Sequence, residues 1–502
     1  MPRFIHYSDV ENVYDDPERA GRLAACISEL DGPDALVVGT GDNTAPGVVA
    51  TVSRGRGAID FFEAIGADVE TFGNHDFDFG ADATRDIVAS SPQTWVSANV
   101  RDENGEPFGR AEGVVPWTVE SVDGARVGVF GVTDPATDSL NPMAADLGFT
   151  DPYEAAEAAV ADLRGEGVDY VVAASHLGGG DDDLARVDGV DLVLGGHVHS
   201  ERAETVDGVL CTRPGVNGEV VLEVELTADG ASVTRHEPAP LSGDGDDGRG
   251  DEDGRGGDDG RPGSVNERLV ASLRERLASA GLDDVVGTVD DPIERTEAAI
   301  HGGESRVGNL VADAYRREAD ADVGLQNAGG IRRGHALAGD VTLADLISIV
   351  PFEEPVVTVE LTGAELLDAF REMSASVADF GEPDWWHGHV SGAEIVWDDD
   401  AAALVAATVG GDPVDPDAVY EVALPEYLLH SDHEFPTIEQ RHRAAEHGIQ
   451  HDAIADYVRE AGLSVAVEGR IRRVNRGGDV DDADAADDAD DTGDIDDTGG
   501  SQ

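Results

Sequence analysis

Carboxylate, amide and imidazole side chains follow five apolar stretches of the sequence, each at the point where an extended segment would end. In FIHYSDVE, Asp9 and Glu11 are two positions apart, a spacing that places side chains on the same side of an extended strand. Functional groups of open α/β sheets gather beyond the carboxyl ends of the strands. The pattern therefore predicts one polar cluster at a sheet edge. In chain order its members are Asp9, Glu11, Asp42, Asn74, His75, Asp76, Asp78, His176, His197 and His199.

Each of these residues has a structural alternative when it is considered alone. A single histidine after an apolar stretch is more often a hydrogen-bonded structural residue. A single aspartate, such as Asp42 in GTGDN, is more often a turn former or a helix cap. Five occurrences of one pattern in chain order favour a metal site. Oxygen and nitrogen ligands without thiolate suit Mn, Mg, Fe, Co or Zn, and so many of them predict two ions bridged by a carboxylate.

The elements that would position this cluster alternate between apolar strands and amphipathic helices, which indicates an α/β domain with a covered sheet. The strands expected in it are 35–39, 67–73, 125–131, 169–175 and 191–196, and the helices are 17–30, 57–66 and 151–167. A later region mixes a helix over 309–319 with strands over 355–362 and 419–425. The sequence therefore predicts two domains of α/β type.

Two segments with almost no apolar residues divide the chain. Residues 241–263 are rich in Gly and Asp and are expected to form a flexible linker. Residues 476–502 are expected to form a disordered acidic tail. The predicted domains are accordingly 1–240 and 264–475.

The charge balance restricts the partners. The formal net charge is −71, and every basic residue other than histidine is an arginine. Such a chain would repel nucleic acid and anionic membranes, and it is typical of a cytoplasmic protein from a high-salt organism. Two distant cysteines form no disulfide framework. The sequence lacks an apolar stretch of about 18 residues, and its first residues lack the pattern of a signal peptide.

The polar series is similar to the signature of the calcineurin-like metallophosphoesterases, and the sequence resembles the 5′-nucleotidase branch of that family. GNHDFDFG matches a motif of this branch closely. The predicted second domain adds GNLVADA over 308–314, NAGGIR over 327–332 and IVPFEE over 349–354. The resemblance covers both predicted domains. It implies an α/β fold with an N-terminal four-layer metallophosphoesterase sandwich and a C-terminal 5′-nucleotidase substrate-binding domain.

The resemblance also implies roles for individual residues. One metal ion would be held by Asp9, Glu11, Asp42 and His199, and a second by Asp42, Asn74, His176 and His197. His75 would stabilise charge beside the phosphate, and Asp78 would orient that histidine. The substrate contacts would be Asn327, Arg332, Phe352, Tyr427, Arg306 and Asp432, with Phe352 and Tyr427 on either side of a base.

The sequence departs from the family pattern at several of these positions. Glu11 stands where the family usually has histidine, and its alternative role is a solvated acid of the surface. Ala328 stands where glycine is commoner, and Asp432 is one place out of register with the family's ribose-binding aspartate. Arg306 and Arg295 are alternatives for one family arginine.

The expected function is divalent-metal-dependent hydrolysis of phosphate esters, with nucleoside 5′-monophosphates as the expected substrates. Mn is the expected ion, and Mg, Co and Zn are alternatives. Cyclic-nucleotide phosphodiesterase, nucleotide-sugar hydrolase and thiosulfohydrolase activities remain alternatives within the family, and a catalytically silent nucleotide-binding protein is an alternative outside it. The expected partner is a small-molecule nucleotide, with no nucleic acid and no membrane. The sequence leaves the base and the oligomeric state open.

Overall fold

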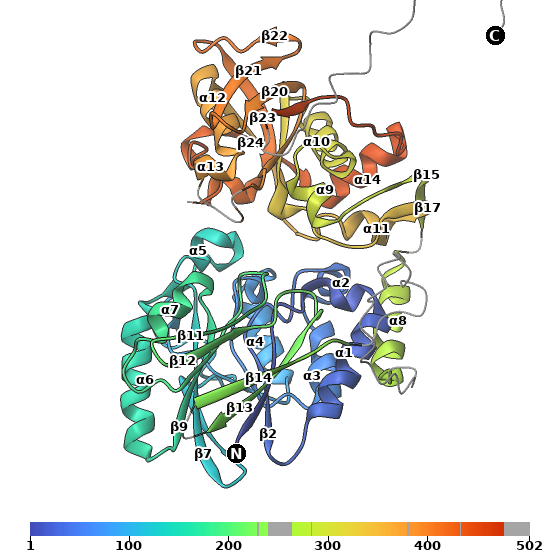
Figure 1. Ribbon diagram of the computed structural model, residues 1–502. Helices are drawn as coiled ribbons and strands as arrows, with labels where there is room; N and C mark the ends of the chain where they lie inside the picture. The colour runs from blue at the N-terminus through green and yellow to red at the C-terminus, as the bar shows by residue number, and fades with distance from the viewer. Residues whose placement is uncertain are drawn as a thin grey trace, which may run out of the picture.

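The described part of the first domain holds two six-stranded sheets that face each other (Figure 1). The computed structural model describes residues 1–475 apart from 228–229, 239–263, 283, 379–381, 383 and 432. The predicted linker, 241–263, and the predicted tail, 476–502, therefore lie outside the described residues.

The first sheet follows the order β14-β13-β1-β2-β3-β4. Strands β1 to β4 run parallel, and β13 and β14 complete one side by antiparallel pairing. Their bounds are β1 Arg3–Tyr7, β2 Ala35–Gly39, β3 Val69–Glu70, β4 Thr94–Trp95, β13 Val221–Thr227 and β14 Gly230–His236. The register pairs Tyr7 with Gly39, so β1 and β2 end at the same level.

The second sheet follows the order β11-β12-β10-β9-β7-β6. Its bounds are β6 Trp117–Val122, β7 Ala125–Thr133, β9 Tyr170–His176, β10 Leu192–Leu194, β11 Arg202–Val206 and β12 Val209–Arg213. Strands β7 and β9 are parallel and pair Thr133 with His176. The carboxyl ends of β7 and β9 therefore lie at one level.

Helices cover the outer faces of the two sheets (Figure 1). They are α1 Pro17–Leu30, α2 Val48–Ser53, α3 Gly57–Ile65, α4 Gly80–Ser90, α6 Pro152–Glu166 and α7 Asp181–Leu184, whereas α5 Thr137–Leu140 lies at the end of the domain that faces the second domain. Phe4 of β1 joins the core between the sheets, while its neighbour Ile5 joins the core under α1 and α3. Adjacent residues of a strand point to opposite faces, so a strand buried on both faces is apolar throughout. The described residues thus form the predicted four layers of helix, sheet, sheet and helix.

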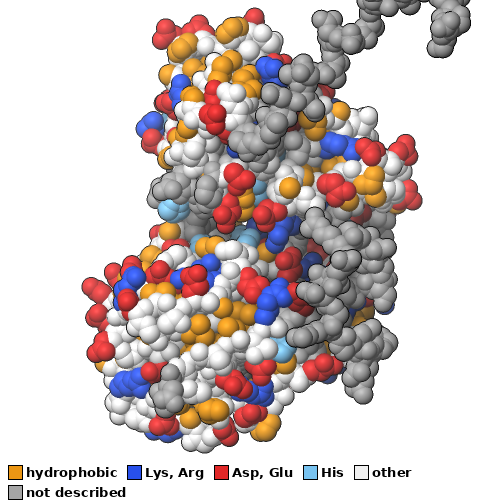
Figure 2. Space-filling model, viewed as in Figure 1, with side chains coloured by type: hydrophobic (Ala, Val, Ile, Leu, Met, Phe, Trp, Pro, Cys, Tyr) orange, Lys and Arg blue, Asp and Glu red, His pale blue; other side chains and the backbone are white. Residues whose placement is uncertain are grey.

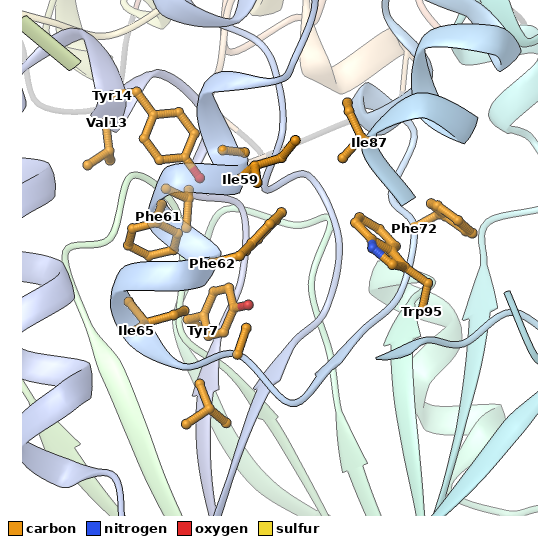
Figure 3. Packing of buried hydrophobic residues seen from close by; sticks show 14 of the residues in the cluster. Tyr7, Val13, Tyr14, Ile59, Phe61, Phe62, Ile65, Phe72, Ile87 and Trp95 are labelled. Carbon is orange, nitrogen blue, oxygen red and sulfur yellow. The ribbon is translucent and has the colours of Figure 1, made fainter. Parts of the chain in front are cut away.

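An aromatic core lies between the first sheet and its helices (Figure 3). Phe61 of α3 packs edge-on against Tyr7 of β1, with ring centroids 5.9 Å apart. Phe72 stacks on Trp95 at 4.7 Å and contacts Phe77 at 5.4 Å. Phe72 and Phe77 flank the segment that carries Asn74 and His75, so this core supports that segment from below.

The second domain contains a five-stranded sheet, a four-stranded sheet and a strand pair within its described residues. The first has the order β19-β16-β23-β18-β24, the second has the order β22-β21-β20-β25, and the pair is β15 with β17. The strands are β15 Val285–Ile293, β16 Val323–Asn327, β17 Leu337–Thr342, β18 Pro355–Thr362, β19 Gly388–Ser391, β20 Ala393–Asp398, β21 Ala403–Val409, β22 Asp412–Pro413, β23 Val419–Pro425, β24 Arg443–Ile449 and β25 Ile471–Val474. The helices are α9 Glu297–His301, α10 Arg306–Ala319, α11 Leu343–Ile347, α12 Gly363–Glu372, α13 Ala375–Ala378 and α14 Gln450–Ala461.

Helix α8, Glu267–Ala280, packs on the first domain although it follows the predicted linker in the sequence (Figure 1). Its Leu269 and Leu273 join the core beneath α1 and α3. Arg276 donates from Nε to Asp60 Oδ2 at 2.9 Å. The interpretation of 264–475 as one structural unit therefore fails at this helix, because its apolar face completes the core of the first domain.

Several predicted elements are found with nearly the same bounds. The helix expected over 17–30 is α1, and the strand expected over 355–362 is β18. The strand expected over 67–73 is shorter, because β3 spans Val69–Glu70 and the chain then turns toward the sheet edge. None of the helices in the described ranges has the length and apolar character needed to span a bilayer.

Candidate functional site

The predicted polar cluster lies at the carboxyl ends of β1, β2, β3, β9 and β10 and faces the second domain. These strands belong to two sheets, so the cluster forms where the two sheet edges meet and not at the edge of one sheet. Figure 2 shows histidine and acidic side chains at the waist between the domains. Both sheets and the second domain therefore contribute to one site.

Asp9 and Glu11 leave β1 through a turn and not through an extended strand. Strand β1 ends at Tyr7, and both residues have left-handed backbone angles, with φ of 49° for Asp9 and 50° for Glu11. The prediction that strand alternation pairs their side chains is wrong. Asp42 and His197 also have positive φ, 54° and 74°. Such conformations are strained for residues other than glycine and cluster at functional sites.

The first group of ligand atoms comes from Asp9, Glu11 and His199, which lie within 4.8 Å of one another. His199 Nε2 is 3.1 Å from Glu11 Oε1. Asp9 is completely buried and Glu11 is 2% exposed. Glu11 is therefore not a solvated surface acid, because its carboxylate points into the site.

The second group comes from Asp42, His176 and His197, whose ligand atoms also lie within 4.8 Å of one another. His176 Nε2 is 3.0 Å from Asp42 Oδ2. Asn74 Oδ1 is 3.0 Å from His197 Nδ1, which adds the amide to this group. The predicted ligands of the second ion thus lie together.

Asp76 holds the loops that carry these ligands. Its carboxylate accepts hydrogen bonds from the backbone N–H groups of Asp42 at 2.9 Å, Gly73 at 2.8 Å and Thr44 at 3.1 Å. A Cβ atom on Gly73 would lie 2.2 Å from Asp42 Oδ1, so only glycine fits there. The motif GNHDFD therefore supplies a support for Asp42 as well as the ligand Asn74.

His75 and Asp78 form the predicted dyad beside the ligands. His75 Nδ1 is 3.1 Å from both carboxylate oxygens of Asp78. Asn141 Nδ2 donates to Asp78 Oδ1 at 2.9 Å and to the carbonyl of Asn74 at 2.7 Å. Burial alone would lower the pKa of His75, but the Asp78 and Asp42 carboxylates outweigh it and raise the pKa to about 9.

Arg332 reaches this site from the second domain. Its Nη2 is 2.9 Å from His75 Nε2 and 3.5 Å from Glu11 Oε1. The guanidinium also lies 5.4 Å from the ring centre of Phe352, and that ring stacks on His75 with centroids 6.0 Å apart. The predicted residues Arg332 and Phe352 therefore meet the predicted dyad across the domain boundary.

Asn327 ends β16, and its side chain contacts buried polar groups of the second domain. Gln326 Nε2 donates to Asn327 Oδ1 at 2.9 Å, and Glu434 forms a side-chain hydrogen bond with Asn327. Burial raises the pKa of Glu434 to about 7. The half-buried Tyr427 lies near both Glu434 and Arg332, because the charges of these two residues shift the pKa of its hydroxyl group.

One predicted substrate residue, Arg306, is not brought to this cluster. The guanidinium of Arg306 donates to the carbonyls of Asp291, Pro292 and Val465, so it ties segments of the second domain together. Its alternative, Arg295, donates to the carbonyl of His335 and to Ser348 Oγ. Asp432 lies outside the described residues. The prediction that Phe352 and Tyr427 enclose a base stays a prediction.

Sequence reasoning did not assign roles to four acidic or amide residues near the site. They are Asp76, Asp134, Asn141 and Glu434. Asp76 lies within GNHDFD, so the motif itself was a signal for it. The other three are single polar residues in a chain with 105 Asp and Glu residues, and only the fold distinguishes them.

The donor set fits divalent cations. It consists of carboxylate and amide oxygens and imidazole nitrogens, which hard and borderline ions prefer. Asp9 is fully buried, and burial raises the pKa of its carboxyl group to about 6. A cation would supply the opposite charge that this buried cluster of carboxylates requires. Asp42 belongs to the second group and also to a group with Glu11 and His75, so it lies between the two sets of ligands.

Comparison with known proteins assigns both domains. Residues 2–201 match the family model for calcineurin-like phosphoesterases, and residues 285–440 match the model for the C-terminal domain of 5′-nucleotidases. The chain is 25% identical over 425 residues to the trifunctional nucleotide phosphoesterase protein YfkN of Bacillus subtilis. The alignment covers 75% of this chain and 28% of YfkN, so the chain spans less than a third of that relative.

Two solved structures share the fold of nearly the whole chain. A 5′-nucleotidase precursor from Thermus thermophilus has a TM-score of 0.76 and 24% identity, and the match covers 95% of this chain and 99% of that one. The sulfate thiohydrolase SoxB from Thermus thermophilus has a TM-score of 0.72 and 18% identity, with 95% and 97% covered. From the two family models, matched in this order along one chain, we conclude that the protein belongs to the 5′-nucleotidase family of calcineurin-like metallophosphoesterases.

Proposed function

We propose that this protein hydrolyses nucleoside 5′-monophosphates to nucleoside and inorganic phosphate with the help of two divalent cations. The observation that carries the proposal is the meeting of Arg332 with His75 across the domain boundary, at 2.9 Å, beside the carboxylates of Glu11 and Asp42. In this contact the Arg332 N–H donates to an unprotonated His75 Nε2. Once Nε2 is protonated, both groups are donors and would turn toward an anion between them. Two such donors side by side are suited to one anion, and a phosphate group is the anion that the family binds.

The first ion would be held by Asp9, Glu11, Asp42 and His199, and the second by Asp42, Asn74, His176 and His197. Bound cations would polarise the phosphoryl oxygens and lower the pKa of the attacking water. Manganese is our first choice, because Glu11 adds an oxygen ligand and a negative charge to the first set.

The protein's own residues position the phosphate and neutralise its charge. The planar guanidinium of Arg332 can contact two phosphate oxygens at once. His75, kept protonated by Asp78, would stabilise the charge that develops on the leaving oxygen. Asn141 fixes Asp78 through its donated hydrogen bond of 2.9 Å, so the orientation of His75 is set before substrate arrives.

The second domain would recognise the nucleoside. Phe352 and Tyr427 offer aromatic surfaces for a base, and Asn327 lies at the end of β16 beside Arg332 in NAGGIR. Binding energy from the nucleoside can also raise kcat, because it holds the phosphate in place during the reaction. We place the two domains in one composite site for this reason.

A direct assay tests the proposal. Turnover of AMP, measured as phosphate release with added Mn in molar salt, should exceed turnover of three alternatives in parallel assays. They are cyclic AMP and a sugar nucleotide, each followed by the nucleotide product, and a thiosulfate ester, followed by sulfate release. Faster turnover of one of these alternatives would assign the site to that substrate. A protein that binds AMP but releases no phosphate with Mn, Mg, Co or Zn would be a nucleotide-binding protein without catalytic activity.

We expect Glu434→Gln to weaken the binding of AMP more than the binding of its 2′-deoxy analogue, dAMP. Within the described residues, Glu434 Oε2 and Gln326 Oε1 are buried without a hydrogen-bond partner, and Glu434 is 6% exposed. Both atoms are acceptors and are suited to sugar hydroxyls. Above pH 7, where the Glu434 carboxyl with its pKa of about 7 is ionised, a hydrogen bond to a charged group contributes about 1.5–3 kcal/mol, so KM for AMP should rise roughly 10- to 100-fold.

The measurement is kcat and KM for AMP and dAMP with the wild type and Glu434→Gln. Asp432→Asn, assayed in parallel, tests the neighbouring acid predicted from the sequence. Equal KM values for AMP and dAMP in the wild type would show that neither acid contacts the 2′-hydroxyl.

A further inference from the structure

We propose that Asp134 is a positioning residue for His197: its carboxylate accepts the Nε2 proton of that imidazole, so that Nδ1 is presented to the second cation. The inference rests on the proposed function only in taking His197 as a metal ligand. It concerns a carboxylate that neither the sequence motifs nor the comparisons assign to the site.

The fold places Asp134 at the same edge as the ligands. It directly follows β7, whose last residue, Thr133, pairs with the ligand His176 at the end of β9. The backbone N–H of Asp134 donates to the carbonyl of His176 at 3.1 Å. The carboxylate is held from one side, since its Oδ1 accepts from the backbone N–H of Ala136 at 2.8 Å.

The other carboxylate oxygen faces His197. Asp134 Oδ2 is 3.6 Å from His197 Nε2, and the side chains are 20% and 24% exposed. This distance is within range of an ion pair and about 0.6 Å longer than an ordinary hydrogen bond. Neither side chain is fully enclosed, and a small rotation of either one would close the gap.

The two nitrogens of His197 face different partners. Nδ1 lies 3.0 Å from Asn74 Oδ1, which is a proposed ligand atom, and Nε2 faces Asp134 on the opposite side of the ring. His176 shows the same division, because its Nε2 is 3.0 Å from Asp42 Oδ2 and its Nδ1 is 2.6 Å from the carbonyl of Thr40. Each ring thus has one nitrogen in the site and an acceptor beside the other.

This arrangement fixes the tautomer of each histidine. Metal-binding histidines almost always donate their second N–H to a carboxylate or carbonyl, and loss of that acceptor typically weakens metal affinity or activity 10- to 100-fold. Asp134 would supply that acceptor for His197, as the Thr40 carbonyl does for His176. It would also resist rotation of the His197 ring away from Asn74.

A contact between domains is the competing role for Asp134. The charge of His433, in the second domain, acts on the Asp134 carboxyl group, so the two lie near each other across the boundary. His433→Ala removes that partner and leaves His197 in place. If Asp134 serves only the domain contact, His433→Ala and Asp134→Asn will have the same effects on metal affinity.

The experiment is a calorimetric titration of the full chain with Mn²⁺, without substrate. We expect Asp134→Asn to weaken one of two binding steps by about 10- to 100-fold and to leave the other unchanged. Asp138→Asn is the matched control, because it removes an exposed carboxylate of α5 only four residues away and should bind as wild type. An Asp134→Asn protein with wild-type affinity at both steps would overturn the proposal.

A double-mutant cycle separates positioning from a general effect on folding. In a His197→Ala background, Asp134→Asn should weaken Mn²⁺ binding no further, because the ring that it orients is gone. Additive losses in the two backgrounds would overturn the proposal. Both titrations are independent of hydrolysis, so a wild type that binds Mn²⁺ without cleaving nucleotides would refute the proposed function and still decide the role of Asp134.

Discussion

Replacement of His75 by asparagine is expected to leave metal affinity unchanged and to lower kcat for AMP by about 10²- to 10⁴-fold. The imidazole is held by Asp78 at 3.1 Å and lies 2.9 Å from Arg332, so it faces the place of the anion. Asparagine keeps a polar group of similar size but cannot carry the positive charge. The measurement combines steady-state kinetics with Mn²⁺ titration of the same preparation.

His236→Asn is a suitable control, because His236 lies on β14 and pairs with Glu223 at 2.9 Å, away from the site. It should retain wild-type kcat. His75 also shares a group of possible ligand atoms with Glu11 and Asp42. A joint loss of Mn²⁺ affinity and kcat in His75→Asn would therefore make His75 a metal ligand, and an unchanged kcat would exclude both roles.

The polar cluster could be predicted because strand ends converge in α/β folds, and each ligand follows an apolar stretch that is visible in the sequence. The local path of the chain through the site could not be predicted in this way. Asp9 and Glu11 meet through left-handed turns, with φ near 50°, which no alternation rule anticipates. Their side chains come together because the loops after β1 and β2 are tied by backbone hydrogen bonds, such as that from Asp9 N to the Gly41 carbonyl at 3.0 Å.

Supporting residues were harder to predict than ligands. Asn141 and Asp134 act through other side chains, and their sequence neighbourhoods contain no motif. Their roles become visible only when β7 and the segment after it are placed beside β9. Helix α8 shows the same limit for a whole element. The spacing of apolar residues can indicate that a helix has an apolar face, but it does not say which domain that face will cover.

The second large effect is expected from replacement of Glu11, which should lower the affinity for the metal ion. Glu11→Ala should weaken Mn²⁺ binding by 10-fold or more at one step, because the carboxylate is 2% exposed and lies 3.1 Å from His199 Nε2. The negative charge is held there by its surroundings. Burial would raise the pKa of Glu11, but Arg332 and His199 outweigh it and bring the pKa to about 2.

The identity of the residue at position 11 should also select the metal. Glu11→His replaces an oxygen by a nitrogen and removes a negative charge, so preference should move from Mn toward Zn or Co. Glu11→Gln keeps an oxygen ligand but removes the negative charge. It should weaken the binding of Mn²⁺ without moving the preference toward Zn or Co. Glu157→Ala, on the exposed side of α6, is the control for loss of one acid from a highly charged chain.

The contact of 3.5 Å between Glu11 and Arg332 adds a consequence for the substrate. Glu11 is the residue that joins the first ion's ligands to the arginine of the second domain. Its loss should therefore raise KM for AMP even at saturating Mn²⁺, since Arg332 would no longer be aimed by a carboxylate. The decisive comparison is a metal titration of activity, followed by KM at saturating metal, for wild type, Glu11→Ala, Glu11→Gln and Glu11→His at one salt concentration. Superimposable metal titrations of wild type and Glu11→Ala would leave the first ion to Asp9, Asp42 and His199, and an unchanged KM would remove the link to Arg332.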